Sequence, residues 1–195
     1  EKKMKVIEPE KKYDFWFKNG HVIDPAQNID KVCDVLVKGN KIAAAPENGA
    51  VDPRDVKETV ECNGYYVLPG LIDHHAHFSW NFNVTGVEPD LYTLPSGVTS
   101  ACDAGSTGSS GFEGFVRSTM QPALITMKAS INVASGGLCT PQYMEDIRPE
   151  NYDVKGLEDL FDRYPQWIYG LKLRLGKDIS DGQGVEPLKA SVKLA

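Results

Sequence analysis

Segments with the periodicity of strands alternate with segments that have the periodicity of helices from Pro69 to Ala195. Strands are expected near 68–77, 97–103, 123–133 and 167–175, and helices near 112–120, near 153–164 and from 187 onward. Consecutive strands joined by helical crossovers pair in parallel, because each crossover returns the chain to the same end of the sheet. The alternation therefore predicts an α/β fold with a parallel sheet.

Residues 13–68 show a different pattern, in which short apolar strands flank tight turns. Asn-Gly pairs at 19–20 and 63–64 and the Lys-Gly-Asn run at 38–40 each lie between two such strands. Asn-Gly readily adopts the positive φ angles that a two-residue hairpin requires. This part of the chain is therefore predicted to be a small antiparallel module of hairpins. Residues 1–12 are charged and lack the apolar core of a signal peptide, so a frayed start is expected.

The composition argues against several classes of function. Acidic residues outnumber basic ones by 27 to 21 and are scattered, so the net charge of −6 disfavours nucleic-acid or anionic-membrane partners. No apolar run approaches the ~18 residues of a membrane span. The four cysteines lie far apart without a Cys-x-x-Cys motif, and they are Cys33, Cys62, Cys102 and Cys139. Their spacing indicates neither a thiolate metal site nor a disulfide framework, and a reducing cytoplasm is the expected location.

The first strand of the α/β part ends in a cluster of polar residues that suits metal binding. Side chains two apart on a strand share a face, so Asp73, His75 and His77 are predicted to point away from His74. Two imidazoles held side by side can bind one ion at about 2.0–2.1 Å, and a neighbouring carboxylate can orient a ring. The alternative is that these histidines have only a structural role, but burying a histidine without a hydrogen-bond partner costs free energy. The Asp-His-His triplet also resembles the signature of a manganese-dependent phosphoesterase family, which nothing else in the chain supports.

The fourth predicted strand carries two cations, because Lys172 and Arg174 occupy one face and leucines the other. Barrel strands are apolar on the outside, and their inward side chains near the C-terminal end face the active site. An inward lysine shielded from water loses its proton readily, and the neutral amine can react with carbon dioxide to form a carbamate that bridges two metals. A half-exposed surface strand with solvated charges shows the same alternation, so that alternative stays open here.

A Gly/Ser-rich segment, 105–111, follows the second predicted strand. Backbone N–H groups in such a segment can bind phosphate, but this one lacks the lysine and the spacing of a P-loop. It is therefore predicted to be a mobile connection.

Three stretches together resemble the amidohydrolase superfamily of metal-dependent hydrolases. They are Val-Leu-Pro-Gly-Leu-Ile-Asp-His-His-Ala-His at 67–77, the Gly-Val-Thr-Ser and Asp-Ala-Gly-Ser segments within 97–106, and Gly-Leu-Lys-Leu-Arg at 170–174. The run Lys-Asn-Gly-His-Val-Ile-Asp-Pro at 18–25 looks like the β-sandwich module that precedes the barrel in that superfamily. The resemblance is strongest to dihydroorotase-like amidohydrolases, which include deacetylases of N-acyl amino acids and related small acylated acids. It implies that 13–68 is the N-terminal part of a composite β-sandwich and that 69–195 forms the first four units of a (β/α)8 barrel.

The resemblance also implies a site. His75 and His77 would bind the more buried of two zinc ions, and carboxylated Lys172 would bridge the two. A hydroxide between the metals, with its pKa lowered toward ~7, would attack the carbonyl of an amide, cyclic amide or ester. Asp73 would orient a ligand histidine. The candidates for holding a substrate carboxylate or the incipient oxyanion are Asn132 and Arg174.

Two features depart from the family pattern. Ser79 stands where relatives that hydrolyse dihydroorotate carry an arginine, so recognition of an orotate-type carboxylate is not expected. Residues 69–195 suffice for four barrel units, since a whole barrel takes roughly 250 residues, and the later histidines and aspartate of the family have no counterpart. The chain is therefore expected to be a truncated piece, one subunit of a split enzyme or a half-barrel that pairs with another copy. The alternatives are a mononuclear deaminase of the same superfamily and a non-catalytic assembly subunit.

Overall fold

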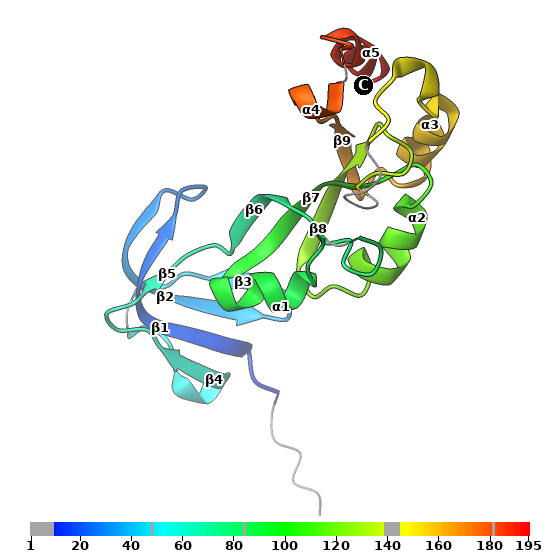
Figure 1. Ribbon diagram of the computed structural model, residues 1–195. Coiled ribbons are helices and arrows are strands. Elements are labelled where there is room, and N and C mark those ends of the chain that lie inside the picture. Colours follow the sequence, from blue (N-terminus) through cyan, green and yellow to red (C-terminus); the bar gives the residue numbers. More distant parts are fainter. Residues whose placement is uncertain (1–9, 48, 84, 139–144, 181) are drawn as a thin grey trace, which may run out of the picture. The chain divides into compact units, whose positions relative to one another are not determined.

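The computed structural model describes residues 10–47, 49–83, 85–138, 145–180 and 182–195 (Figure 1). The contacts between residues divide the chain into two compact units, and the boundary along the chain falls between Pro69 and Gly70. The first unit contains a mixed sheet and the second a parallel sheet with helices, so the chain is α/β as predicted. None of the helices in the described ranges is both long enough and apolar enough to cross a membrane.

The sheet of the first unit is mixed rather than purely antiparallel. Its strands are β1 (Tyr13–Asp24), β2 (Ile29–Lys38), β3 (Lys41–Ala44), β4 (Val56–Glu61) and β5 (Tyr66–Val67), with a short turn η1 (Pro53–Asp55) before β4. The pairs β1–β2 and β2–β3 are antiparallel, whereas β4 and β5 both pair with β1 in parallel. The predicted hairpin at 38–40 is confirmed as the β2–β3 connection, where Gly39 has a φ of 58°.

The Asn-Gly pair at 19–20 is a bulge inside β1, so the hairpin predicted there is wrong. Asn19 has a φ of 60°, and the register of β1 against β2 shifts between Phe17 and Gly20. Oδ1 of Asp34 accepts the backbone N–H of Asn19 at 2.9 Å. The positive φ angle thus serves a bulge, because a side chain of the neighbouring strand bonds the N–H group that the bulge displaces from the ladder.

The Asn-Gly pair at 63–64 joins two strands that do not pair with each other, so this predicted hairpin is also wrong. Gly64 has a φ of 82°, and the N–H of Tyr65 donates to the C=O of Cys62 at 2.9 Å. β4 pairs with the part of β1 before the bulge and β5 with the part after it. Because a bulge bends its strand, the neighbouring chain follows β1 as two short segments instead of one.

Residues 10–12 contact the first sheet, although they were expected to be frayed. The ammonium group of Lys12 pairs with Asp55 at 2.7 Å. Nζ of Lys38 donates to the C=O of Lys11 at 2.9 Å. Residues 1–9, the rest of the predicted frayed start, lie outside the described residues.

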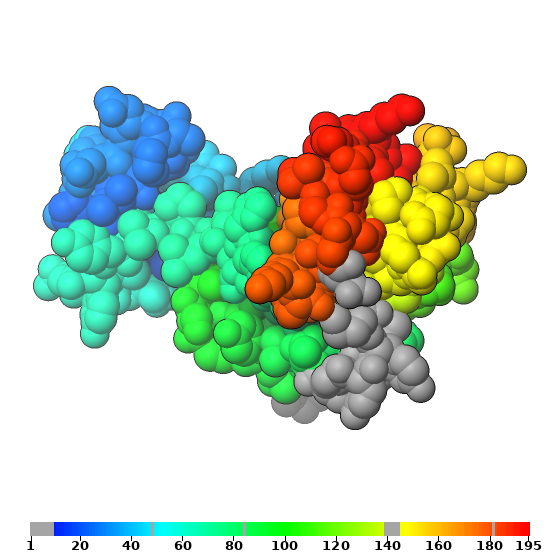
Figure 2. Space-filling model, turned by 45° about the horizontal axis from the view of Figure 1, so that its top comes forward, coloured from blue at the N-terminus to red at the C-terminus, as the bar shows by residue number. Residues whose placement is uncertain are grey.

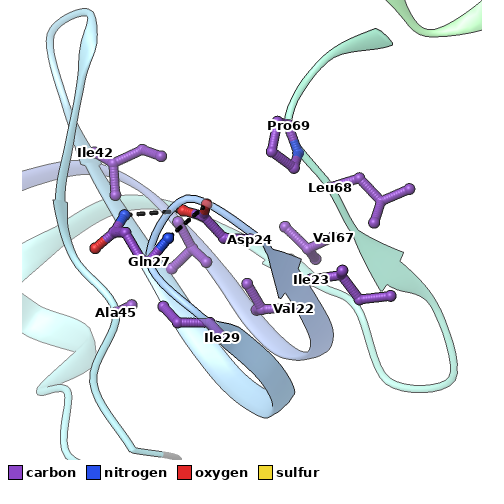
Figure 3. Close-up of a pocket in the computed structure, with 11 residues that line it drawn as sticks. Val22, Ile23, Asp24, Gln27, Ile29, Ile42, Ala45, Val67, Leu68 and Pro69 are labelled. Atoms are coloured by element: carbon purple, nitrogen blue, oxygen red, sulfur yellow. Dashed lines mark hydrogen bonds between the residues drawn. The ribbon is translucent and has the colours of Figure 1, made fainter.

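A small apolar pocket of about 100 Å³ lies on the first unit (Figure 3). Most of its lining comes from the aliphatic side chains of Val22, Ile23, Ile29, Val35, Ile42, Val67 and Leu68. The carboxylate of Asp24 accepts Nε2 of Gln27 at 2.9 Å and the N–H of Ala26 at 3.0 Å. Because its polar groups already bond within the protein, the pocket offers an apolar surface rather than reactive groups.

The second unit is a four-stranded parallel sheet in the order β6-β7-β8-β9 (Figure 1). Its strands are β6 (Leu71–Ala76), β7 (Val98–Gly108), β8 (Thr126–Asn132) and β9 (Ile168–Lys172). Its helices are α1 (Pro89–Thr93), α2 (Phe112–Phe115), α3 (Val154–Arg163), α4 (Lys177–Ser180) and α5 (Glu186–Leu194), with short turns η2 (Leu94–Ser96), η3 (Val116–Met120) and η4 (Pro149–Asn151). All four predicted strands and all three predicted helices are present, whereas α1 and α4 were not predicted.

The core of the second unit lies between the sheet and the helices on one of its faces. Met127, Ala129 and Ile131 of β8 are buried in one cluster with aromatic and aliphatic side chains of α2 and α3. The C-terminal helix α5 lies beside α3, and Leu194 packs against the same cluster (Figure 2). Because side chains alternate along a strand, Asn132 and its neighbours at 128 and 130 point to the other face. That face carries the candidate site.

Candidate metal site

His75 and His77 lie side by side at the C-terminal end of β6. Their ring centroids are 5.7 Å apart and the ring planes meet at 87°. The register of β6 against β7 shifts between Asp73 and Ala76, so this end of the strand does not alternate strictly. The carboxylate of Asp73 accepts the backbone N–H of His75 at 3.0 Å. Asp73 therefore fixes the backbone of a candidate ligand, whereas the sequence predicted a contact with an imidazole ring.

The ring of His74 reaches a residue of β9, and the predicted opposition between His74 and the other two histidines stays a prediction. Its ring contacts Tyr169 of β9, with centroids 5.6 Å apart. β6 and β9 are the outer strands of the sheet and would be about 14 Å apart if it were flat. The two rings meet because the sheet curls as a barrel wall does.

A chain of hydrogen bonds leads from His77 into β7. Nδ1 of His77 lies 3.0 Å from Oγ of Ser106, and that hydroxyl donates to Oδ2 of Asp103 at 2.7 Å. The Asp103 carboxylate also accepts the N–H groups of Phe78 and Ser106. Since the single hydroxyl proton goes to Asp103, the serine oxygen accepts from Nδ1–H of His77. This assignment leaves the lone pair on Nε2, where a metal can bind it.

The surroundings of His77 favour the neutral ring. Desolvation lowers the pKa of this half-buried imidazole, Asp103 opposes the shift, and the neighbouring charges of Lys172, His75 and Arg174 lower the pKa further. Burial likewise raises the pKa of Asp103 against the effect of its hydrogen bonds. Neutral imidazole is the form that binds metals. The ends of β6 and β9 also meet at β7, where His77 lies next to Ser106 and the stem of Lys172 lies against Gly105.

Lys172 reaches this place because Gly105 leaves room for it. Gly105 has a φ of 79°, and a Cβ built there would lie 2.4 Å from Cβ and 2.5 Å from Cγ of Lys172. Any other residue at 105 would displace the partly buried lysine. The mobile connection predicted for 105–111 is wrong in its first part, because β7 continues to Gly108 and pairs there with Asn132. No local sequence pattern indicates that this glycine receives a side chain from two strands away.

Glu145 joins the two predicted substrate-binding residues. Its side chain is 4% exposed, and it accepts Nη1 of Arg174 at 2.6 Å and Nδ2 of Asn132 at 2.7 Å. Asn132 is fully buried, and its amide also bonds to the C=O of Gly105 and the N–H of Ala134. The side chain of Arg174 remains 45% exposed. The geometry thus leaves Arg174 accessible to a ligand and makes Asn132 part of the support.

The donor atoms of this site fit part of a zinc centre. Two imidazoles would supply the nitrogen ligands that zinc prefers, and Lys172 would supply oxygen once carboxylated. The space over Gly105 admits the lysine stem beside the other side chains of the site. Within the described ranges, no group of three or more His, Cys, Asp and Glu side chains is placed to hold a metal. His75, His77 and Lys172 therefore stay predicted ligands, and the described ranges do not complete a set for two ions.

No protein-family model matches the chain. A deacetylase of Agrobacterium fabrum is 28% identical over 163 residues, which cover 83% of this chain and 40% of the deacetylase. A dihydroorotase of Streptococcus pneumoniae is 45% identical over 65 residues, which cover 31% of this chain and 14% of that enzyme. The crystal structure of a dihydroorotase superposes with a TM-score of 0.79 at 24% identity, over 93% of this chain and 48% of that one. These relatives confirm the predicted resemblance to the deacetylase and dihydroorotase-like branch of the amidohydrolase superfamily.

The chain spans less than half the length of the curated deacetylases that it matches. The crystal structure of an adenine deaminase gives a similar superposition, with a TM-score of 0.78 at 24% identity over 93% of this chain and 47% of that one. The curled parallel sheet and these superpositions confirm the predicted first half of a (β/α)8 barrel after a small β module. The partial coverage agrees with the prediction that the chain resembles the N-terminal part of such proteins.

Proposed function

We propose that this chain supplies part of a binuclear zinc site that hydrolyses the amide, cyclic amide or ester bond of a small acylated acid, most simply as a deacetylase. The observation that carries the proposal is that His77 and Lys172 contact adjacent residues of β7, since Nδ1 of His77 lies 3.0 Å from Oγ of Ser106 and the stem of Lys172 lies against Gly105. The names of the related proteins, deacetylase and dihydroorotase, support hydrolysis of a C–N bond.

Each ligand has a definite part in this proposal. His75 and His77 would bind one ion through their ring nitrogens, and Lys172, as its carbamate, would bridge that ion to a second. When bound, the two ions would supply a hydroxide near neutral pH and polarise the scissile carbonyl. The ammonium group first loses one proton, and the neutral amine nitrogen then bonds to the carbon of CO₂ and releases a second proton. A cation thus becomes an anion that suits two metals.

Three other residues hold these ligands in place. Ser106 and Asp103 would keep the proton of His77 on Nδ1 and direct Nε2 toward the metal. Asp73 would fix the turn of the backbone at His75. Such supporting contacts matter because a ligand that is already oriented loses less conformational freedom when the ion binds.

We propose that further strands close the barrel and bring the remaining ligands. β6 and β9 are the outer strands of the sheet, and on β6 the side chains of Leu71 and Ile72 are 52% and 70% exposed. An exposed strand edge with apolar side chains is a template for further pairing. The additional strands would come from a longer chain, from a second polypeptide or from another copy.

We propose a cytoplasmic location because the described cysteines are free thiols. Cys33, Cys62 and Cys102 are free thiols, and Cys139 lies outside the described residues. Burial raises the pKa of the Cys33 and Cys62 thiols, which keeps them in the less reactive protonated form. Free thiols persist in a reducing compartment.

Metal content and activity of the intact protein test the proposed function. Zinc is measured by plasma emission, molar mass by light scattering, and hydrolysis on a panel of N-acetyl and N-formyl amino acids, hydantoins and lactones. We expect two zinc ions per site, and we expect Lys172→Ala to lose the bridge, at least one ion and most of the activity. Lys189→Ala, on the surface of α5, is the matched control.

Three outcomes would count against the proposal. Lys172→Ala with both ions and full activity would remove the lysine from the site. A wild-type protein that binds one ion and keeps it in Lys172→Ala would point to the mononuclear deaminase class. Protein that binds no zinc in any assembly would favour a non-catalytic subunit.

A further inference from the structure

Glu145 is a buried carboxylate that the proposed metal chemistry does not use. Burying a carboxylate is costly unless both of its oxygens have partners. One oxygen accepts Arg174 at 2.6 Å and the other accepts Asn132 at 2.7 Å, so both are satisfied. Glu145 thereby connects the end of β8 with the segment that follows β9.

The support beneath Glu145 is rigid. Asn132 is fully buried, and its amide bonds at once to Glu145, to the C=O of Gly105 in β7 and to the N–H of Ala134. Gly105 also receives the stem of Lys172. The carboxylate is therefore fixed by the same residues that shape the candidate metal site.

Arg174 is held by this carboxylate at one nitrogen. The ion pair uses Nη1, and 45% of the side chain remains exposed. A guanidinium has five N–H donors, so the described contact leaves an edge for another acceptor. Lys172 ends β9, two residues before Arg174, and Leu171, Leu173 and Leu175 pack in one apolar cluster, which favours a common face for the two cations between them.

We infer that Glu145 is a positioning residue that aims the accessible edge of Arg174 at a carboxylate of the substrate, so that the site selects acylated acids over their neutral amides. This inference rests on the proposed function, because it assigns Arg174 to the same site. A guanidinium binds a carboxylate through two parallel N–H···O bonds. Anchoring the arginine beforehand reduces the side-chain freedom that is lost when the substrate binds.

The test compares an N-acetyl amino acid with its carboxamide, using the zinc-loaded full protein. We expect the wild type to prefer the acid. Arg174→Met should lower kcat/KM for the acid roughly 10- to 100-fold, mainly through KM, because a hydrogen-bonded charge is lost. The carboxamide, which has no charge for Arg174 to bind, should change by less than about threefold.

Glu145→Gln separates positioning from a general structural role. It keeps the size of the side chain and removes the charge, so the acid should lose roughly 3- to 10-fold in kcat/KM while the carboxamide does not. In the Arg174→Met background the same change should not reduce the preference for the acid further, because Glu145 acts through Arg174. Arg117→Met, an exposed arginine of η3, is the matched control.

The outcomes that overturn the inference are distinct from those that overturn the proposed function. Equal losses on the acid and the carboxamide, or an unchanged preference in Arg174→Met, would make the Glu145–Arg174 pair purely structural. If the wild type hydrolyses neither compound, the proposed function fails for this substrate class. Calorimetric binding of the same two compounds then tests the inference about Glu145 and Arg174 by itself. Binding of the acid that disappears in Arg174→Met would support the inference, whereas equal binding would contradict it. If Glu145→Gln does not fold, Arg174→Lys keeps the charge without the planar fork and should lose part of the preference.

Discussion

The hydroxyl of Ser106 determines which nitrogen of His77 is free for a metal. It accepts from Nδ1 and donates to a carboxylate that is itself held by two backbone N–H groups. A site with two histidines on one strand therefore depends on a neighbouring strand for the orientation of one of them. Partners of this kind affect metal affinity about 10- to 100-fold when they are removed.

Ser106→Ala should lower the affinity for zinc by this factor of about 10 to 100 while the protein stays folded. The measurement is a competition with a chelating dye. Ser118→Ala, at an exposed position of η3, should leave the affinity unchanged. An affinity in Ser106→Ala equal to that of the wild type would mean that the hydrogen bond does not orient His77.

Gly105→Ala should destabilise the second unit by about 2–4 kcal/mol, from a positive φ angle combined with overpacking. The added methyl group would lie 2.4 Å from Cβ of Lys172. Gly170→Ala in β9 is the control, because a Cβ there meets nothing within 4 Å. Urea unfolding measures both variants, and a Gly105→Ala protein as stable as Gly170→Ala would contradict the described approach of Lys172.

Among the elements, α3 contacts the loop after β7 through its N-cap residue, Asp153. The carboxylate of Asp153 accepts the N–H of Gly156 at 3.1 Å and the hydroxyl of Ser109 at 2.7 Å. Asp153→Ala should cost about 1–2 kcal/mol in the free energy of unfolding, as the loss of a helix cap does. Asp159→Ala removes an exposed ion pair with Arg163 in the same helix and should cost less than about 0.5 kcal/mol. Equal costs would mean that the cap contributes nothing.

The sequence predicted elements well where a pattern repeats and poorly where a single pair of residues determines the geometry. The strands and long helices of the second unit follow from apolar periodicity, whereas α1 and α4 are too short to show a period. An Asn-Gly pair allows a positive φ angle in a hairpin or in a bulge. At 19–20 the bulge is stabilised by Asp34, which lies 15 residues from Asn19 in the chain.

The candidate site was predictable where its residues fall in a compact motif. His75, His77 and Lys172 stand in such motifs. Their role as metal ligands remains a proposal. The contacts of Glu145 could not be predicted, because its partners lie 13 and 29 residues away in the chain. The role of Gly105 likewise depends on a side chain of β9. Contacts of this kind arise from the curl of the sheet, which no local pattern encodes.

For the whole molecule, closure of the barrel should be visible in the exchange of backbone amides. If further strands cover the outer edge of β6 in the intact protein, the amides of 71–76 should exchange as slowly as those of 98–104 in β7. Hydrogen–deuterium exchange with mass spectrometry measures both segments in one sample. Rapid exchange confined to 71–76 would mean that this edge remains open to solvent.

The central claim is that side chains from β6 and β9 share one metal centre. The most direct measurement is a crystal structure of the zinc-loaded intact protein with anomalous scattering recorded at the zinc edge. We predict one peak at about 2.0–2.1 Å from a ring nitrogen of each of His75 and His77, and a second peak bridged to the first by a carboxylated Lys172. Zinc bound elsewhere, or an unmodified Lys172 that contacts neither peak, would contradict the account.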